Sequence, residues 1–368
     1  MGSTHDLIVI GGGPAGCSAA ITAARSGAKV LLLERGRLPR NKVCGEFVSA
    51  ESLALLTCLL DTQGPELLER AYRVPEVRFF SDGLVIGSPL NPPGASISRF
   101  ELDFALWEAA QRSGVDAQQQ VAVEKVSGEG PFRVLTKLGE FEGRAVLKAC
   151  GRWSNLSART LARPNGRSNW LGVKAHFAEQ GCPQSVDLYF FDGGYCGVQP
   201  VSLRGHGEEG RINVCAQVRA DVASTLSDVF EQHPVLQERS RNWQQLMEPV
   251  STAPLIFCKP RPVEGNILLA GDTAGFVDPF VGDGISLALR SGALAGRSLM
   301  PFLMGKISLE EAARSYWQTY ETELSSIFSV SSKVRHVFFL LPRTLRVMTL
   351  STIKRSPALV RLLVRHTR

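Results

Sequence analysis

The 368-residue chain lacks several features that would place it in a large class of proteins. It has no apolar run approaching the ~18 residues of a membrane span. Its eight cysteines include no C-x-x-C pair and no companion histidine spacing, so neither a metal site nor a disulfide framework is predicted. A strand pattern begins almost at once and leaves no room for a signal peptide. These absences lead us to expect a cytoplasmic protein.

The composition is that of a sizeable globular protein. Hydrophobic residues make up 44% of the chain and charged residues 21%, both ordinary for a folded protein. The chain is long enough to bury a large core and to form more than one folding unit. Neither internal repeats nor low-complexity tracts interrupt it.

A glycine-rich loop stands near the N-terminus, after the apolar residues 6–10. Those residues are typical of a buried parallel strand. The loop has the G-x-G-x-x-G spacing, in which the first glycine permits a tight turn, the second lets the backbone approach a pyrophosphate and the third lets a helix pack closely on the strand. The alanine-rich residues 14–27 predict that helix, with its N-terminus facing the phosphates. The binding residues predicted here are Gly11, Gly13, Pro14, Ala15 and Gly16.

A second apolar strand pattern, residues 29–34, ends in an acid. Glu34 lies 23 positions after Gly11, close to the ~20 expected for a carboxylate that binds a ribose hydroxyl. Strand, loop, helix, strand and acid together predict a dinucleotide-binding unit, with Glu34 and Arg35 among its binding residues.

A second glycine-rich segment lies far along the chain. The apolar residues 267–270 are followed by Gly271 and Asp272, and then by Gly282 and Gly284. A nicotinamide enzyme needs only the first loop, whereas a protein that buries a whole FAD also needs residues at the far end of the cofactor. The pair of loops therefore predicts a flavoprotein.

Several motifs carry a family resemblance. Residues 39–46 (PRNKVCGE) match a P-x-x-K-x-C-G-E segment, and residues 98–106 (SRFELDFAL) match an R-x-x-L/F-D-x-x-L helix start. Gly271 and Asp272 match a second FAD motif, and residues 279–289 (PFVGDGISLAL) match the loop and helix that follow it. In these segments the chain resembles the flavin-dependent oxidoreductases built like p-hydroxybenzoate hydroxylase, and most closely their geranylgeranyl reductase-like branch.

The resemblance implies roles for these segments. Residues 39–46 would run beside the flavin ring, Arg99 would reach the FAD, and Asp272 would hold its ribityl chain. The helix that follows Gly284 would face the pyrimidine end of the flavin. The cofactor-binding residues predicted beyond the first unit are Cys44, Gly45, Arg99, Val123, Gly271, Asp272, Gly282, Gly284 and Ile285.

The chain departs from the family pattern in two places. Within residues 148–157, Cys150 stands where many relatives carry the acid of an Asp-Gly motif associated with cofactor and NADPH handling. This leaves open how the protein is reduced. Residues 195–200 (YCGVQP) stand where prenyl reductases carry Y-x-W-x-F-P along their lipid cavity, but the tryptophan and phenylalanine are absent. A polyprenyl tail is therefore not the expected substrate.

We predict an α/β protein with a Rossmann-like FAD-binding domain, an inserted antiparallel β-sheet substrate domain and a helical C-terminal region. The FAD-binding domain must be discontinuous, because its two loops have to meet in space. Its predicted segments are 1–75, 96–165 and 256–300, the substrate or cap domain takes 76–95 and 166–255, and the helical basic region takes 301–368. The cap strands are predicted at 170–177, 185–191, 195–201 and 211–218.

The last 38 residues are strongly basic. Residues 331–368 contain nine lysines and arginines and no acid, and they turn a net charge of −3 for the rest of the chain into +6. Apolar residues such as Phe338, Leu345 and Leu350 are interleaved with the cations. Such a helix can lie on an anionic membrane surface, or it can pack its apolar face on the body with its cations in water. No recognised module accompanies the charge, so nucleic-acid binding is not expected.

A flavin performs the redox step, while the protein positions the reactants and excludes water. The chain has no second G-x-G-x-x-G loop, so NAD(P)H is expected to bind only transiently. We favour NAD(P)H-dependent hydroxylation or epoxidation of a small hydrophobic aromatic or polyketide-like natural product, because the prenyl-cavity motif is eroded. The alternative is a geranylgeranyl reductase-like reduction of a prenyl or lipid alkene. A non-catalytic flavin-binding protein is a third reading.

Cys44 is the candidate catalytic residue. A thiol beside the flavin could donate a proton during alkene reduction, or it could simply pack against the ring. Halogenation would require a W-x-W-x-I-P motif, which none of the five tryptophans forms. Core packing is the commoner role of a phenylalanine, and a histidine on a strand is more often structural. With that reservation, the residues predicted to wall the substrate site are Phe47, His176, Tyr195, Gln199, Phe276 and Phe280.

Overall fold

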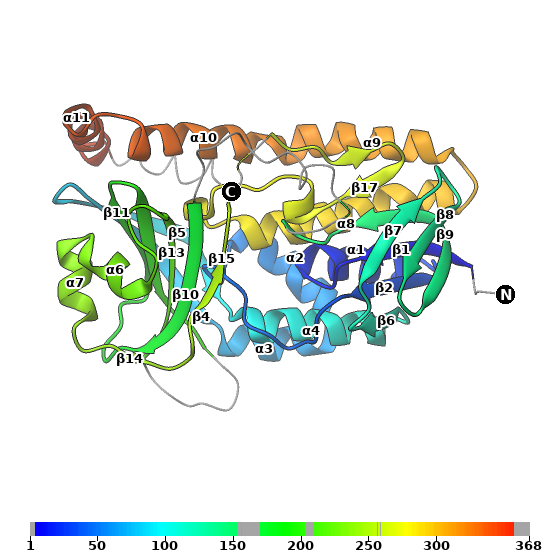
Figure 1. The fold of residues 1–368 in the computed structure, drawn as a ribbon, viewed down its shortest axis with the longest axis horizontal. Coiled ribbons are helices and arrows are strands. Elements are labelled where there is room, and N and C mark those ends of the chain that lie inside the picture. Colours follow the sequence, from blue (N-terminus) through cyan, green and yellow to red (C-terminus); the bar gives the residue numbers. More distant parts are fainter. Residues whose placement is uncertain are drawn as a thin grey trace.

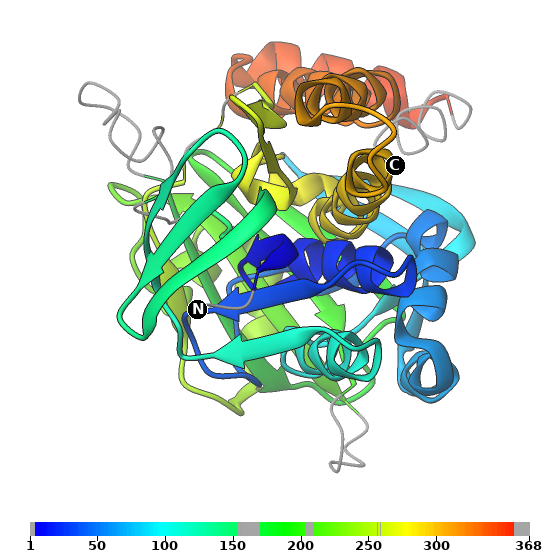
Figure 2. The same ribbon diagram turned by 90° about the vertical axis from the view of Figure 1, so that its right-hand side faces the viewer.

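The computed structural model describes residues 4–152, 156, 170–202, 210–255, 257 and 259–356. Two β-sheets lie toward opposite ends of its long axis, and the C-terminal helices run along one side of both (Figure 1). Viewed along that axis, the same helices lie on one side of the parallel strands (Figure 2). The predicted boundary at 165–166 and the end of the basic region, 357–368, lie outside the described residues.

The first sheet is the nucleotide-binding sheet, with strand order β16-β17-β9-β1-β2-β6. Its central strands are parallel, and the register sets Leu7 opposite Val30 and Ile10 opposite Leu33. These apolar side chains are all buried, as expected for a sheet covered on both faces. The strands of this sheet are β1 (His5–Ile10), β2 (Val30–Glu34), β6 (Asp116–Gln119), β7 (Val123–Ser127), β8 (Phe132–Thr136), β9 (Gly139–Lys148), β16 (Val263–Glu264) and β17 (Ile267–Leu269).

Close packing of two helices brings the two glycine loops together. These helices are α1 (Pro14–Arg25) and α8 (Gly284–Leu303). A Cβ added at Gly292 would lie 2.1 Å from the carbonyl oxygen of Ala15, so only glycine allows this approach. The Ser18 hydroxyl also donates a 2.7 Å hydrogen bond to the carbonyl of Leu289. Helix packing thus joins residues that are 271 positions apart in sequence.

Three further helices and a short 3-10 helix lie between residues 50 and 112, and two more 3-10 helices lie within the second loop. α4 begins as its motif predicts, because the Ser98 hydroxyl accepts a hydrogen bond from the backbone N–H of Glu101. These elements are α2 (Ala50–Leu60), η1 (Asp61–Gln63), α3 (Gly64–Arg70), α4 (Arg99–Arg112), η2 (Gly271–Thr273) and η3 (Pro279–Val281).

The second sheet, the cap sheet, has strand order β14-β10-β13-β12-β11-β4-β5-β3, and β15 also pairs with β10. Short helices α6 (Leu226–Glu231) and α7 (Pro234–Ser240) pack on it through buried Leu226, Val229 and Leu236. The strands are β3 (Phe47–Val48), β4 (Tyr72–Ser81), β5 (Leu84–Ser96), β10 (Trp170–Ala178), β11 (Ser185–Phe191), β12 (Gly194–Pro200), β13 (Arg211–Arg219), β14 (Gln244–Gln245) and β15 (Val250–Thr252).

The predicted fold class is confirmed, with one difference inside the cap. The pairing of β4 with β11 is parallel, so the sheet is mixed and not wholly antiparallel. The two strands come from separate chain segments, and no hairpin forces them to run in opposite directions. The sheet also takes its first long strand from Tyr72, four residues before the predicted insert, and includes β3.

The C-terminal helices are α9 (Leu309–Glu323), α10 (Ser325–Phe339) and α11 (Arg343–Lys354). α9 is tied to the first sheet, because the Tyr316 hydroxyl donates to the carbonyl of Leu269 at 2.8 Å. α10 and α11 pack on the cap sheet, where Phe338 and Leu350 are buried. The inner face of the basic region therefore packs on the body. No helix in the described part of the chain is long and apolar enough to cross a membrane.

Candidate functional site

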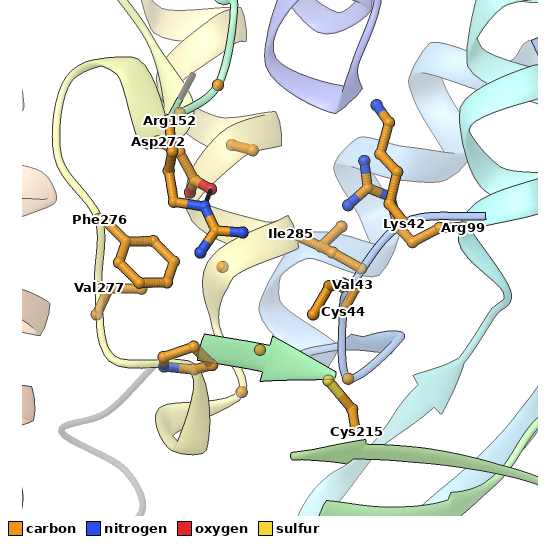
Figure 3. A pocket seen from close by; sticks show the side chains of 18 of the residues that line it. Lys42, Val43, Cys44, Arg99, Arg152, Cys215, Asp272, Phe276, Val277 and Ile285 are labelled. Carbon is orange, nitrogen blue, oxygen red and sulfur yellow. Dashed lines mark ion pairs between the residues drawn. The ribbon is translucent and has the colours of Figure 1, made fainter. Parts of the chain in front are cut away.

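One cavity of about 840 Å³ lies between the two sheets and the C-terminal helices. Both glycine loops line one end of it, and apolar side chains from the cap sheet, α10 and α11 line the other. Figure 3 looks into the cavity, with Lys42 and Arg99 on one side and Arg152 and Asp272 on the other.

The first glycine loop has little room except toward the cavity. Gly11 has a φ of 112°, and an added Cβ would lie 2.3 Å from the carbonyl oxygen of Ala149. A Cβ at Gly16 would lie 1.8 Å from the carbonyl oxygen of Gly11. At Gly13, which precedes α1, an added Cβ would meet only the Lys42 ammonium, at 3.7 Å. The N-terminus of α1 therefore faces the cavity with open space before it, as a phosphate site requires.

Glu34 organises the loop that it faces. It is 4% exposed at the end of β2. Its Oε2 accepts a 2.8 Å hydrogen bond from the backbone N–H of Gly12. Its Oε1 accepts from the backbone N–H of Gly36 at 2.7 Å and from the Arg40 guanidinium at 2.9 Å. The carboxylate is thus fixed at the rim of the cavity, where the sequence placed a ribose-binding acid.

The second loop presents an acid and another helix N-terminus. Asp272 faces the Arg152 guanidinium, with 3.6 Å between Oδ2 and Nε. Burial raises the pKa of Asp272, although Arg152, Arg99 and Lys42 act in the opposite direction. Gly282, at a φ of 77°, leads into α8, and an added Cβ at Gly284 would meet nothing within 4 Å. The two helix N-termini therefore open on the same cavity.

A buried aspartate holds two cations at the opposite wall. Asp103 is fully buried and accepts hydrogen bonds from Arg99 at 2.7 and 2.8 Å. Its Oδ2 also lies 2.9 Å from the Lys42 ammonium. Burial would raise the pKa of Asp103, but Arg99 and Lys42 lower it to about 2. One carboxylate against two cations leaves this wall net positive, which suits a pyrophosphate.

The cap sheet fixes the loop that carries Cys44. The Asn213 amide of β13 donates to the backbone carbonyls of Cys44 and Gly45, at 3.1 and 2.9 Å. The half-buried Cys44 sulfur accepts from the backbone N–H of Glu46 at 3.4 Å. Cys215, two residues along β13, also lines the cavity, and burial raises its pKa to about 12.

Glu46 joins the same loop to the cap sheet through a buried charge cluster. Its carboxylate contacts the Lys174 ammonium and lies 2.8 Å from Nε2 of His176, both on β10. It also accepts from the backbone N–H of Arg99 at 2.7 Å. Burial would raise the pKa of Glu46, but Lys174 and His176 lower it to about 2. Glu46 has a φ of 61°, so the cluster holds a strained residue in place.

The far end of the cavity is an apolar chamber. Phe47, Tyr195 and Phe280 stand near the 39–46 loop, while Phe338 of α10 and Leu350 of α11 close the other side. The rings pack on one another, with Phe190 stacked on Phe338 at 3.8 Å and Tyr195 edge-on to Phe280 at 5.9 Å between centroids. These walls favour an apolar or aromatic guest.

The structure brings most of the predicted site residues to this cavity. Gly16 lies one layer deeper, against Gly11. The predicted cofactor-binding residues that line the cavity are Gly11, Gly13, Pro14, Ala15, Glu34, Arg35, Cys44, Gly45, Arg99, Val123, Gly271, Asp272, Gly282, Gly284 and Ile285.

The predicted substrate wall divides into three groups. Phe47, Tyr195, Gln199 and Phe280 line the cavity beside the apolar chamber. Phe276 also lines it, but at the cofactor end, where the Arg152 guanidinium lies 4.4 Å over its ring. His176 does not line the cavity and is turned toward Glu46. The prediction for His176 is therefore corrected, because a buried carboxylate needs hydrogen-bonding partners and His176 is one of them.

Comparisons with known proteins agree with this site. A family model described as FAD dependent oxidoreductase matches residues 6–50. Digeranylgeranylglycerophospholipid reductase 2 of Methanopyrus kandleri is 25% identical over 354 residues, which cover 90% of this chain and 86% of that protein. Menaquinone reductase of Mycolicibacterium smegmatis is 25% identical over 389 residues, covering 99% and 91%. These findings support an FAD-dependent oxidoreductase, and the chain is similar over most of its length to reductases of the geranylgeranyl reductase-like branch.

The fold of this oxidoreductase is also that of known flavoenzymes. The solved structure of the flavin-dependent brominase Bmp2 matches with a TM-score of 0.80 at 18% identity, covering 99% of this chain and 93% of that one. The chondrochloren halogenase CndH matches with a TM-score of 0.75 at 21% identity, covering 89% and 81%. At these identities the likeness concerns the fold alone.

The residues of the oxidoreductase fit FAD. Space is open in front of Gly13 and Gly284, and no described side chain caps α1 or α8 through a hydrogen bond. Backbone N–H groups at both helix starts can therefore receive oxygen atoms of the cofactor. Glu34 lies at the rim of the cavity, where the sequence predicts a ribose-binding acid, and Lys42 and Arg99 add positive charge to the cavity wall.

Sequence reasoning missed several residues of the site. Among them, Lys42 and Arg152 are two of the cations that line the cavity, and Asn213 anchors the Cys44 loop. Lys42 stood within a quoted motif, so its charge was a usable signal. Arg152 also stood within a quoted segment, residues 148–157, whereas Asn213 lies far from the motifs in sequence and only the tertiary structure brings it to the Cys44 loop.

We expect Asp272→Ala to weaken FAD binding by roughly 10- to 100-fold, because it removes a charged hydrogen-bond acceptor from the cavity wall. The dissociation constant is measured by titrating apoprotein with FAD and following quenching of flavin fluorescence. Glu264→Ala is a matched control, since Glu264 pairs with Lys148 and does not line the cavity. Wild-type affinity in Asp272→Ala would contradict the assignment.

Proposed function

We propose that the protein uses NAD(P)H and O2 to hydroxylate or epoxidise a hydrophobic aromatic or polyketide-like molecule. The observation that carries the proposal is the continuity of one cavity, from the two glycine loops into the aromatic chamber. A cofactor bound along the loops leaves the chamber for the apolar body of a substrate. The chamber lies between the cap sheet and α10 and α11, which exclude water from it.

The residues of the chain position the reactants. FAD, when bound, supplies the redox chemistry by accepting hydride and passing electrons on. Lys42 and Arg99 offset the charge of its phosphates, and the Asn213 amide keeps the backbone at Cys44 and Gly45 in place beside the chamber. The Glu46 cluster ties that backbone to the cap sheet, so loop and chamber wall are held as one unit.

The thiol and the phenol that line the cavity beside the chamber, Cys215 and Tyr195, favour oxygenation over alkene reduction. Reduction needs a proton donor whose pKa is not far from the working pH. Burial raises the pKa of Cys215 to about 12 and that of Tyr195 well above its ordinary value. Both groups hold their protons too tightly to deliver them readily. Oxygen transfer also takes up one proton as O2 is reduced, but it needs no proton delivered to a carbon atom of the substrate.

Alkene reduction stays the second candidate because of Cys44. Its thiol lies on the loop beside the chamber, next to Arg99. Two relatives are named digeranylgeranylglycerophospholipid reductase and menaquinone reductase. If this reading holds, Cys44→Ser should lower alkene reduction by about 10²-fold, the size of a lost general acid. Monooxygenation would be changed little, and rates of both reactions measured side by side distinguish the two roles.

Product mass tests the proposed reaction. Purified protein with FAD and NADPH is incubated in air with hydrophobic phenols and, without air, with prenyl alkenes. A product heavier by one oxygen atom, with matching O2 uptake, supports monooxygenation. A product heavier by two hydrogens, formed without O2, would replace it with the reductase reading. NADPH that never reduces the flavin would favour a non-catalytic flavin-binding protein.

A further inference from the structure

A buried amide in the cavity wall has no partner in the protein. Gln217 of β13 is 2% exposed and lines the cavity. Its Nε2 and Oε1 are both buried and make no hydrogen bond. A buried polar group left in this way costs about 1–3 kcal/mol, so native proteins rarely keep one without a ligand or water to bind.

The position of Gln217 connects it to the reactive end of the cavity. In the register of the cap sheet it lies opposite Tyr195 of β12 and Gly172 of β10. A Cβ added at Gly172 would lie 2.9 Å from Val43, so the 39–46 loop reaches the sheet at this row. The amide is therefore close to the flavin-side loop and next to an aromatic wall residue.

Another glutamine on the same sheet provides a contrast. Gln199 also lines the cavity, but its Nε2 donates to the Ser96 hydroxyl at 2.6 Å. That amide joins β12 to β5 and has a structural role. Gln217 has no such bond, so its donor and acceptor are available to a guest.

We propose that Gln217 binds a hydroxyl or carbonyl group of an otherwise apolar substrate. An amide offers a donor and an acceptor side by side, so it can satisfy a phenol hydroxyl or a ring carbonyl. This inference rests on the proposed function and narrows its substrate class to molecules with a polar group on the ring. Plain hydrocarbons would leave the amide unpaired and bind less tightly.

Equilibrium dialysis of the FAD-loaded protein tests the site without turnover. The probes are para-hexylphenol and hexylbenzene, which differ by one hydroxyl group. Wild-type protein should bind the phenol about tenfold or more tightly than the hydrocarbon. Gln217→Met and Gln217→Leu should reduce this preference to about twofold or less. Gln245→Met, on exposed β14 of the same sheet and outside the cavity lining, is a matched control and should keep the preference.

The proposal would be overturned if the wild-type protein bound para-hexylphenol no more tightly than hexylbenzene. It would also be overturned if the Gln217 variants kept the wild-type preference for the phenol. Flavin content of each variant reports whether it has folded, and two replacements guard against one of them misfolding. Because no NADPH is present, the result is independent of the reaction. Preserved preference with no oxygenated product would refute the proposed reaction while leaving the amide site intact.

A different observation concerns the outer face of α10 and α11. Leu340, Leu345 and Met348 are 67%, 50% and 66% exposed there. α11 is held by Arg346, which is buried and pairs with Asp82 at 2.7 Å and Asp192 at 3.0 Å. The helix lies at one end of the molecule (Figure 1), and its inner face lines the chamber with Leu350.

We infer that the outer face formed by Leu340, Leu345 and Met348, here called the tip, docks on an anionic lipid bilayer. Arg343, Lys354 and Arg355 are exposed at the two ends of α11, and residues 331–368 contain no acid. A second copy of the chain on a two-fold axis would bring cations against cations. A bilayer with anionic headgroups accepts both the cations and the apolar side chains. It would also present apolar substrates beside the chamber wall.

Vesicle sedimentation tests the docking. The FAD-loaded protein should bind phosphatidylglycerol-containing vesicles, and more weakly in high salt or with phosphatidylcholine alone. Leu345→Glu/Met348→Glu should weaken binding about tenfold or more, and Lys354→Gln/Arg355→Gln should also weaken it. Leu135→Glu/Leu138→Glu, at exposed sites on the other sheet, is the control and should bind normally. The docking proposal would be overturned if all variants bound vesicles equally or if the wild-type protein did not bind them. It would also be overturned if the tip variants changed a dimer into a monomer, because the tip would then be a contact between two copies.

Discussion

Gly13→Val is expected to give folded protein that contains no FAD. At Gly13 the space for a Cβ is open on the cavity side, and only the Lys42 ammonium lies within 4 Å. A valine therefore fits the protein itself, but its side chain would occupy the approach to the N-terminus of α1. The pyrophosphate could then no longer reach the backbone N–H groups. Flavin content after purification, together with circular dichroism, checks both parts of the result.

A second glycine in the loop gives the contrasting outcome. Gly11 has a φ of 112°, and its Cβ would collide with the carbonyl of Ala149 at 2.3 Å. Gly11→Ala should therefore reduce the yield of folded protein, and not only its flavin content. Full FAD retention in Gly13→Val would show that the phosphates lie elsewhere.

Glu46→Gln is expected to destabilise the protein by about 3–5 kcal/mol, because it leaves Lys174 buried without its counter-charge. Both side chains are fully buried, so water cannot replace the lost partner. Thermal unfolding with saturating FAD should show a midpoint lower by at least about 5 °C. Glu46→Gln/Lys174→Met removes both charges and should recover part of the loss. If Glu46→Gln unfolds at the same temperature as the wild-type protein, the cluster does not have this stabilising role.

The same cluster sets an acid limit for the fold. The pKa of Glu46 is about 2 in the folded protein, below its ordinary value of 4.5. A depressed carboxyl pKa contributes stability that is complete above pH 4.5 and is lost as the pH falls toward 2. Wild-type protein should therefore lose stability through this window. Glu46→Gln should show a shallower dependence, although Asp103 titrates in the same range.

The nucleotide-binding half could be predicted well from the sequence because its signals are local. The glycine spacing, the apolar strands and Glu34 all lie within residues 6–34. Their places in the structure follow from strand and helix geometry alone. The second loop was recognised by the same logic, but its contact with the first depends on Gly292 of α8, which no motif singled out.

The cap and its buried charges were harder to predict because they depend on tertiary contacts. Lys174 and His176 alternate along β10 and therefore point to the same face, but nothing near them identifies Glu46 as their partner. The parallel pairing of β4 and β11 likewise joins residues that are 109 positions apart, such as Glu76 and Ser185. Gln217 could not be singled out, since only the structure shows that its amide is buried and unbonded.

The most direct test is the visible spectrum of the purified protein, followed by identification of any released cofactor and addition of NADPH without air. The account predicts a flavin spectrum, FAD as the released cofactor and bleaching by NADPH that reverses in air. A protein that shows no flavin spectrum, even after it is incubated with FAD, would contradict the central claim that this cavity binds FAD for redox chemistry.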